Sequence, residues 1–217
     1  MFVLSPFPRR FPCVALAALF ACARPEPPPE PAGTSSLREE LIELGRRDQQ
    51  GREGLTIDFA KDTAKLREMM RVDSANAARL AEIVRQHGWP GKSEVGPEAA
   101  QAAFLIVQHS ESLEFRKEML ALIGAAAAKG EADMSDVAML SDRILNAEGR
   151  PQVYGSNFQI RDGRLVPYPI TDPARLDERR AAIGLPPMSV YVEQLRQVYK
   201  GPVDFDTTKL APDTTRN

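Results

Sequence analysis

Apolar residues recur every three or four positions along most of this chain, which is the period of an amphipathic α-helix. Leu37, Leu41 and Leu44 form the first apolar stripe, which follows Ser36, and Ser36 has the spacing of a capping box with Glu39. The same period, ended by glycine or polar residues, predicts helices at residues 36–50, 74–87, 97–109, 113–129, 135–148, 173–183 and 189–199, and a weaker helical stretch at 62–72.

Single residues mark where several of these helices begin and end. Asp73 is placed to cap a helix that starts at Ser74, and Gly88 is placed to end it. Gly96-Pro97 predicts the start of the next helix, because proline fits the first helical turn.

The helical period is interrupted at residues 152–170. Two short extended runs, 152–160 and 164–170, flank Asp162-Gly163. This dipeptide favours a two-residue hairpin turn, because both central positions of that turn need a positive φ. The chain therefore predicts a mainly α (α+β) fold: a single helical domain of about six to seven helices with one late β-hairpin, around 152–170.

The N-terminal residues have the order of a secretory signal peptide. Arg9 and Arg10 precede an apolar run, 11–21, that is too short to span a membrane. Ala21-Cys22 resembles the lipobox of bacterial lipoproteins, in which Cys22 becomes the lipid anchor; the alternative is an ordinary signal peptide cleaved nearby. We expect an extracytoplasmic, membrane-anchored lipoprotein, or otherwise a secreted or periplasmic protein. It would comprise a signal peptide (1–22), a proline-rich linker (23–34), a helical domain (35–200) and a loose C-terminal tail (201–217).

Composition limits the chemistry of the domain. The net charge is −2, and there is no cluster of lysine and arginine, so nucleic acid is not an expected partner. Both cysteines, Cys13 and Cys22, lie in the signal-peptide segment, which leaves the domain without a thiol nucleophile or a disulfide. His87 and His109 are the two histidines, and no metal-binding motif contains them. We therefore expect no metal site and no cofactor.

Several short polar and glycine-containing segments follow one another in a fixed order along the chain. They are Asp48-Gln49 with Arg52, Asp73 with Asn76, Gly88-Trp89-Pro90, Val95-Gly96, Gln108-His109, residues 140–143, 149–157 and 169–172, and residues 180–185. In this order they resemble a bacterial family catalogued as domain of unknown function 6624. The resemblance covers residues 37–191 and implies the boundaries of the fold, but no activity, cofactor or partner. The family's tyrosine motif usually ends in Thr-Gln, where this chain has Ser156-Asn157.

Asp142 and His109 are the catalytic candidates. Asp142 would serve as an acid, a base or a ligand acceptor beside Arg143, whose planar guanidinium suits an anion. His109 ends an apolar run, where an imidazole can transfer protons near neutral pH. The structural alternatives are that Asp142 pairs with Arg52, that Arg143 binds a hairpin carbonyl, and that His109 is a hydrogen-bonded core residue.

The segment from Gln152 to Asn157 is a second candidate. In an extended strand Gln152, Tyr154 and Ser156 would share one face and could line a polar pocket. Alternatively, Tyr154 fills core space with its hydroxyl bound to Asp142 or His109.

Three functions stay open at this point. The first is a membrane-tethered module that binds a small polar ligand or an envelope protein. The second is a metal-independent envelope hydrolase or lyase, with Asp142 or Asp48 and His109 as acid and base. The third is a structural protein–protein interaction domain. The ligand-binding candidates are Asp48, Arg52, His109, Asp142, Arg143, Gln152, Tyr154 and Asn157.

Overall fold

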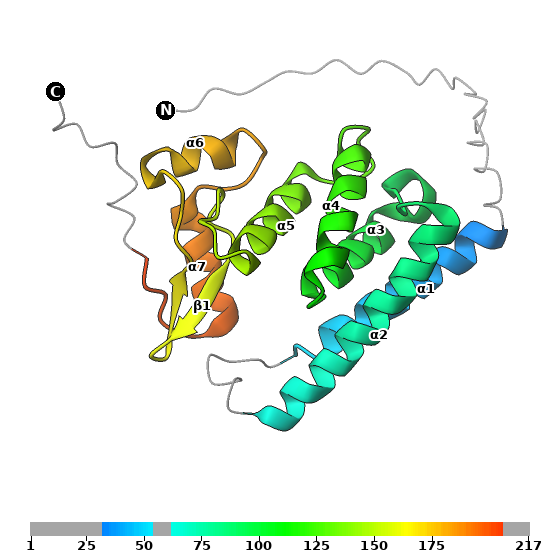
Figure 1. Cartoon of the computed structure of the whole chain (residues 1–217), viewed down its shortest axis with the longest axis horizontal. Coiled ribbons are helices and arrows are strands. Elements are labelled where there is room, and N and C mark those ends of the chain that lie inside the picture. Colours follow the sequence, from blue (N-terminus) through cyan, green and yellow to red (C-terminus); the bar gives the residue numbers. More distant parts are fainter. Residues whose placement is uncertain (1–31, 54–61, 206–217) are drawn as a thin grey trace, which may run out of the picture. The chain divides into compact units, whose positions relative to one another are not determined.

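The computed structural model describes residues 32–53 and 62–205. This part of the chain contains seven α-helices and one late two-stranded antiparallel hairpin, which confirms the mainly helical fold (Figure 1). The elements are α1 (Ala32–Gln50), α2 (Thr63–His87), α3 (Lys92–His109), α4 (Leu113–Ala127), α5 (Met134–Ala147), β1 (Phe158–Arg161), β2 (Arg164–Pro167), the 3-10 helix η2 (Pro173–Arg175), α6 (Leu176–Ala181) and α7 (Met188–Tyr199).

The predicted signal peptide, Cys22 and most of the proline-rich linker lie outside the described residues. Helix α1 already begins at Ala32, so Ser36 lies inside the helix and the predicted capping box at its start is wrong. None of the described helices is both long enough and apolar enough to cross a membrane.

Helices α1 to α5 enclose the larger of two hydrophobic clusters. Leu41, Leu80, Phe104, Ile123 and Leu140, one from each of these helices, are at most 2% exposed. Helix α3 is apolar on most sides because it lies among the others, as the unbroken run of alanine and large apolar residues predicts. We call this cluster the helical core.

Glycine at position 45 allows α1 to pack closely against α3. A Cβ atom at Gly45 would lie 2.6 Å from the Cβ of Ala102, which is closer than two carbon atoms can approach. The close approach matters for function, because it brings the last turns of α1 and α3 together.

The predicted break at Asp73 does not occur, and α2 is one continuous helix. Asp62 caps it instead, through a hydrogen bond from the backbone N–H of Lys65. The Asp73 side chain binds Arg52, from the turn after α1, so a tertiary ion pair replaces the local cap. Gly88 ends the helix as predicted, with φ of 81°.

The second half of α3 starts where the sequence predicts. Gly96 has φ of 81° and ψ of 160°, which is not helical, and Pro97 opens the straight segment that continues to His109. A short helical turn, Lys92 to Val95, precedes this kink.

The hairpin and the last two helices enclose the second hydrophobic cluster, which we call the C-terminal cluster. The turn residues Asp162 and Gly163 have φ of 51° and 72°, as the predicted two-residue turn requires. Leu165, Leu176 and Met188 are at most 4% exposed. Val203 also packs here, and the backbone beside it bonds to Leu165, so the segment assigned to a loose tail is ordered at least to residue 205.

The strands are shorter than predicted, because residues 152–157 do not extend β1. Gln152 forms only an isolated bridge to Ile170. The expectation that Gln152, Tyr154 and Ser156 share one face of a strand is therefore wrong. Three backbone N–H groups in this segment instead turn inward to the carboxylate of Asp142.

Asp136 is a buried acid in the first turn of α5, with 5% of its surface exposed. Burial, assisted by the charge of Asp133, raises the pKa of its carboxyl from 3.8 to about 6. The folded protein thus holds this proton more tightly than the unfolded chain does.

We expect the contribution of Asp136 to stability to be greatest below about pH 4 and to be lost as the pH rises to about 6. The variant Asp136→Asn should lack this loss and should have a free energy of unfolding about 1–3 kcal/mol higher at pH 7. Urea unfolding of both proteins at pH 4 and pH 7 measures it. The same pH dependence in variant and wild type would contradict the expectation.

Candidate functional site

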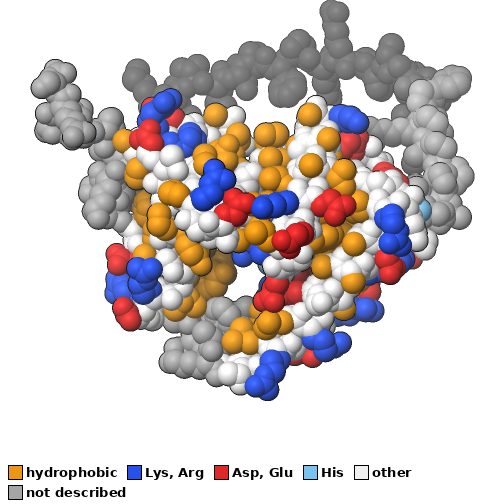
Figure 2. All heavy atoms as spheres, in the orientation of Figure 1, with side chains coloured by type: hydrophobic (Ala, Val, Ile, Leu, Met, Phe, Trp, Pro, Cys, Tyr) orange, Lys and Arg blue, Asp and Glu red, His pale blue; other side chains and the backbone are white. Residues whose placement is uncertain are grey.

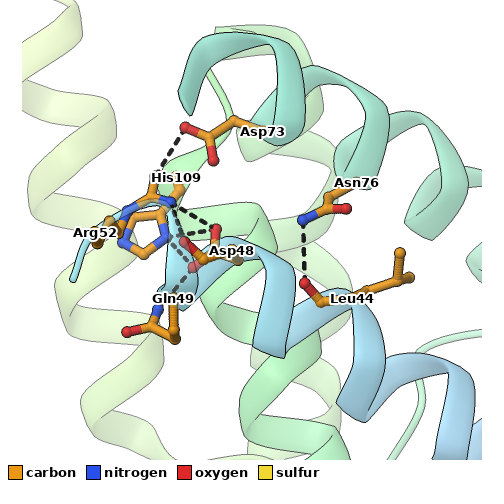
Figure 3. Close-up of polar contacts among 7 residues, drawn as sticks. All are labelled: Leu44, Asp48, Gln49, Arg52, Asp73, Asn76 and His109. Atoms are coloured by element: carbon orange, nitrogen blue, oxygen red, sulfur yellow. Dashed lines mark hydrogen bonds and ion pairs between the residues drawn. The ribbon is translucent and has the colours of Figure 1, made fainter. Parts of the chain in front are cut away.

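Four charged or ionisable side chains meet at one end of the helical core. Asp48 lies in the last turn of α1, Arg52 in the turn after it, Asp73 within α2 and His109 at the end of α3. Figure 3 shows the Asp48 carboxylate directed at the His109 ring, with Arg52 between the two aspartates. We call these four residues the Asp48 cluster.

The Asp48 carboxylate is the centre of this cluster and is completely buried. Its two oxygens each lie 2.9 Å from Nδ1 of His109, and Arg52 donates to Oδ1 at 3.1 Å. Arg52 also donates to Asp73 at 2.8 Å, and Gln49 donates to the second Asp48 oxygen at 2.7 Å. Because a carboxylate accepts hydrogen bonds, Nδ1 of His109 carries a hydrogen and the ring is held in one orientation.

A cavity of about 390 Å³ opens beside the Asp48 cluster, between the helical core and the C-terminal cluster. Its walls come from the ends of α3 and α4, from α5, from the hairpin and from α7. Figure 2 shows this face of the molecule hollowed between the hairpin and the helical core. His109 lines the cavity and Asp48 does not, so the imidazole ring lies between Asp48 and the cavity.

Two arginines give the cavity a positive charge. Arg116 is 8% exposed, and it donates to the backbone carbonyls of Glu111 and Ser112. Burial lowers the pKa of Arg116, and burial together with the nearby charge of Arg116 lowers the pKa of Arg143. Neither guanidinium forms an ion pair with another described residue, although the charges of Glu111 and Glu114 act on Arg116, and the described residues that line the cavity include no aspartate or glutamate.

The cavity also contains polar atoms that lack a hydrogen-bond partner. Within residues 32–53 and 62–205, the buried side-chain atoms that have no hydrogen-bond partner include Nε of Arg143, Oε1 of Gln108 and both amide atoms of Asn146. All three residues line the cavity. Buried polar groups are normally hydrogen-bonded, so these atoms, which lie just behind the surface of the cavity wall, are an unfavourable feature of the free protein.

The wall opposite the helical core is aromatic. Phe158, Tyr168, Tyr191 and Tyr199 line it. Tyr191 is fixed by a 2.9 Å hydrogen bond to the Ser156 carbonyl and by its contact with Phe158. Burial raises the pKa of its phenol, which therefore stays neutral at physiological pH. The cavity thus combines two cations with a preformed aromatic surface.

Asp142 lies outside the cavity and holds the segment after α5. Its carboxylate is completely buried, and it accepts hydrogen bonds from the backbone N–H groups of Val153, Tyr154 and Ser156 at 2.7–3.1 Å. The Ser156 hydroxyl donates a further bond at 2.9 Å. Neither Arg52 nor Arg143 pairs with Asp142, contrary to the structural alternative for Arg52.

We expect Asp142→Asn to lower the free energy of unfolding by about 2–3 kcal/mol, because the new NH₂ group would face backbone donors instead of accepting from them. Chemical denaturation measures this loss. Asp177→Asn, which alters one bond to the N–H of Met188, is the comparison. An unchanged midpoint for Asp142→Asn would show that the carboxylate does not hold the segment.

Of the other candidates between residues 152 and 157, one lines the cavity and two do not. Gln152 is completely buried, and its side chain bonds to the backbone of Asn157 and to the carbonyl of Tyr168. Tyr154 is not among the cavity-lining residues, and its carbonyl accepts from Arg180. Asn157 lines the cavity.

Thus the structure brings His109, Arg143 and Asn157 to one cavity, with Asp48 and Arg52 behind His109. Two further cavity residues, Arg116 and Asn146, were not predicted from the sequence. Nothing in the local sequence separates them from the exposed polar residues of the same helices, and only tertiary packing turns them inward. Within the described residues, no three His, Cys, Asp or Glu side chains are grouped closely enough to hold a metal ion.

Comparison with known proteins gives a family but no characterised relative. No curated protein and no solved structure matches the chain. The family model for DUF6624, described as a family of unknown function, matches residues 35–204, which include the Asp48 cluster and every residue of the cavity. The chain therefore belongs to the DUF6624 family.

Proposed function

We propose that this domain binds the phosphate group of a small organic molecule in the cavity. The observation that carries the proposal is the pair Arg116 and Arg143: Arg116 is 8% exposed, Arg143 is half-buried, and no carboxylate of the described residues lines the cavity beside them. Burying a cation without a counter-charge is unfavourable, and a bound anion would supply that charge.

The number of charges favours phosphate over a carboxylate. A phosphate monoester carries close to two negative charges at pH 7 and three strong acceptor oxygens, which matches two guanidinium groups. Arg116 and Arg143 both line the cavity, so guanidinium donors lie in its wall for those oxygens. The aromatic wall leaves space for an organic body, and a volume of about 390 Å³ suits a small molecule.

Titration calorimetry of the full chain with inorganic phosphate and glycerol phosphate tests the proposal, with glycerol as the uncharged control. We expect a Kd of about 1 mM or tighter for both phosphate compounds and no saturable heat from glycerol. The affinity should rise between pH 5 and pH 7.5, as phosphate gains its second charge, and fall with added salt. Absence of saturable phosphate binding would overturn the proposal.

We also propose that the domain is held at a membrane surface outside the cytoplasm through a lipid on Cys22. Support comes from the order of Arg9, Arg10, the apolar run and Ala21-Cys22, followed by the proline-rich residues 23–34.

Metabolic labelling with a radioactive fatty acid should mark the wild-type protein and should be lost in Cys22→Ala. The matched control is Cys13→Ala, which removes the other cysteine of the chain and should keep the label. Labelling that persists in Cys22→Ala would contradict the assignment of the anchor.

A further inference from the structure

His109 presents one ring nitrogen to the Asp48 cluster and has the other one free. Nδ1 is bound to Asp48 at 2.9 Å, while no hydrogen bond to Nε2 is found among the described residues. Because the ring lies between Asp48 and the cavity, Nε2 is the nitrogen left to face the cavity. With the hydrogen on Nδ1, Nε2 carries a lone pair that can accept a proton.

We infer that this cavity hydrolyses phosphate diesters, with His109 as the proton acceptor and Asp48 as the residue that positions it. The inference rests on the proposed phosphate site. Its distinguishing feature is an oriented imidazole that lines the same cavity as two arginines, neither of which forms an ion pair with a described residue.

The charge of the cavity suits a diester in particular. A phosphate diester carries one negative charge in the ground state, and attack by water on phosphorus brings a second negative charge onto the phosphoryl oxygens. Arg116 and Arg143 together carry two positive charges, so they match the transition state better than the bound substrate. Preferential stabilisation of developing charge is what accelerates a reaction.

The step balances without a metal ion or a further reactant. Nε2 of His109 takes one proton from a water molecule as the water oxygen forms a bond to phosphorus. The bond from phosphorus to the leaving oxygen breaks on the opposite side of phosphorus, and that oxygen takes a proton from solvent water while the imidazolium gives its proton back to solvent. The products are an alcohol and a phosphate monoester, and Asp48 stabilises the imidazolium in between.

Water is the nucleophile that the geometry supports. Ser156 is a hydroxyl residue lining the cavity, but its hydroxyl donates to Asp142 at 2.9 Å and not to His109. His109 contacts Asp48, which also pairs with Arg52, and Arg52 in turn pairs with Asp73. The other charged or ionisable residues that line the cavity with His109 are Arg116, Arg143, Tyr168, Tyr191 and Tyr199.

The test measures release of p-nitrophenol from bis(p-nitrophenyl) phosphate by the full chain, with EDTA present to silence contaminating metal enzymes. We expect turnover of the diester and competitive inhibition by inorganic phosphate. His109→Gln should lower kcat by about 100-fold or more while phosphate still binds. The matched control is His87→Gln, which removes the other, exposed histidine and should leave the rate unchanged.

Asp48→Asn provides a second readout that a merely structural role would not move. Because the imidazolium would lose its carboxylate partner, kcat should fall by about 10-fold or more while KM and the affinity for phosphate stay close to the wild-type values. A wild-type protein that binds phosphate but does not hydrolyse the diester would overturn this inference and leave the phosphate site standing. Full activity in His109→Gln, or a phosphorylated histidine trapped during turnover, would overturn the role of His109. Failure to bind phosphate would overturn the proposed function itself.

Discussion

Replacing Arg143 by methionine is expected to abolish phosphate binding and, at the same time, to stabilise the protein. The guanidinium has a buried Nε without a partner and lies close enough to the Arg116 charge for that charge to lower its pKa. Methionine keeps much of the side-chain length without the charge. We expect phosphate affinity to fall by about 100-fold, as the loss of charge-assisted hydrogen bonds implies. The free energy of unfolding should rise by about 1–2 kcal/mol.

Calorimetry and urea unfolding of the same preparations measure both effects. The control is Arg175→Met, whose guanidinium is 69% exposed and pairs with Glu178, and it should change neither quantity appreciably. If Arg143→Met bound phosphate as tightly as the wild type, the cavity would not be the phosphate site. If it were less stable than the wild type, the arginine would have a structural partner that the geometry does not show.

Replacing Asp48 by alanine is expected to cause a large loss of stability, about 3–5 kcal/mol. This is the usual effect of removing one member of a buried ion pair. The substitution removes one of the two carboxylates that pair with Arg52, which keeps Asp73 and the backbone carbonyl of residue 48, and it deprives Nδ1 of His109 of its acceptor. The ends of α1 and α3 would lose the polar contact that joins them.

Thermal and urea unfolding measure this loss, and Glu43→Ala is the comparison. Glu43 also accepts hydrogen bonds from two arginines, Arg46 and Arg47, but its side chain is 40% exposed, so its removal should have little effect. Equal effects of the two substitutions would show that burial does not set the strength of the Asp48 cluster.

Local patterns predicted the helices and the hairpin turn, because periodic apolar residues and the Asp162-Gly163 pair act over short distances. They failed where a tertiary contact outweighed a local preference. Asp73 has the sequence of a helix cap, yet its carboxylate pairs with Arg52, 21 residues away, and the helix continues through it. Residues 152–157 have the alternation of a strand, yet Asp142 draws their backbone out of it.

For the candidate site, too, the sequence indicated single residues but not the tertiary contacts between them. Asp48 and His109 could be chosen from the sequence by residue type and by the resemblance to the family, but their contact across 61 residues could not. Arg116 has no local feature that distinguishes it from its exposed neighbours, and its importance depends on the packing of α4 beside α5. Whether an arginine forms an ion pair depends on the tertiary structure, so the unpaired guanidinium groups of Arg116 and Arg143 could not be predicted from the sequence.

The carboxylate of Asp142 has a consequence for how the molecule opens. It belongs to a helix of the helical core, and it holds the backbone that leads into the hairpin of the C-terminal cluster. Separating the hairpin region from the helical bundle would therefore break several charge-assisted hydrogen bonds in one step. We expect the two hydrophobic clusters to unfold as one cooperative unit, with their amide hydrogens exchanging through a shared opening event.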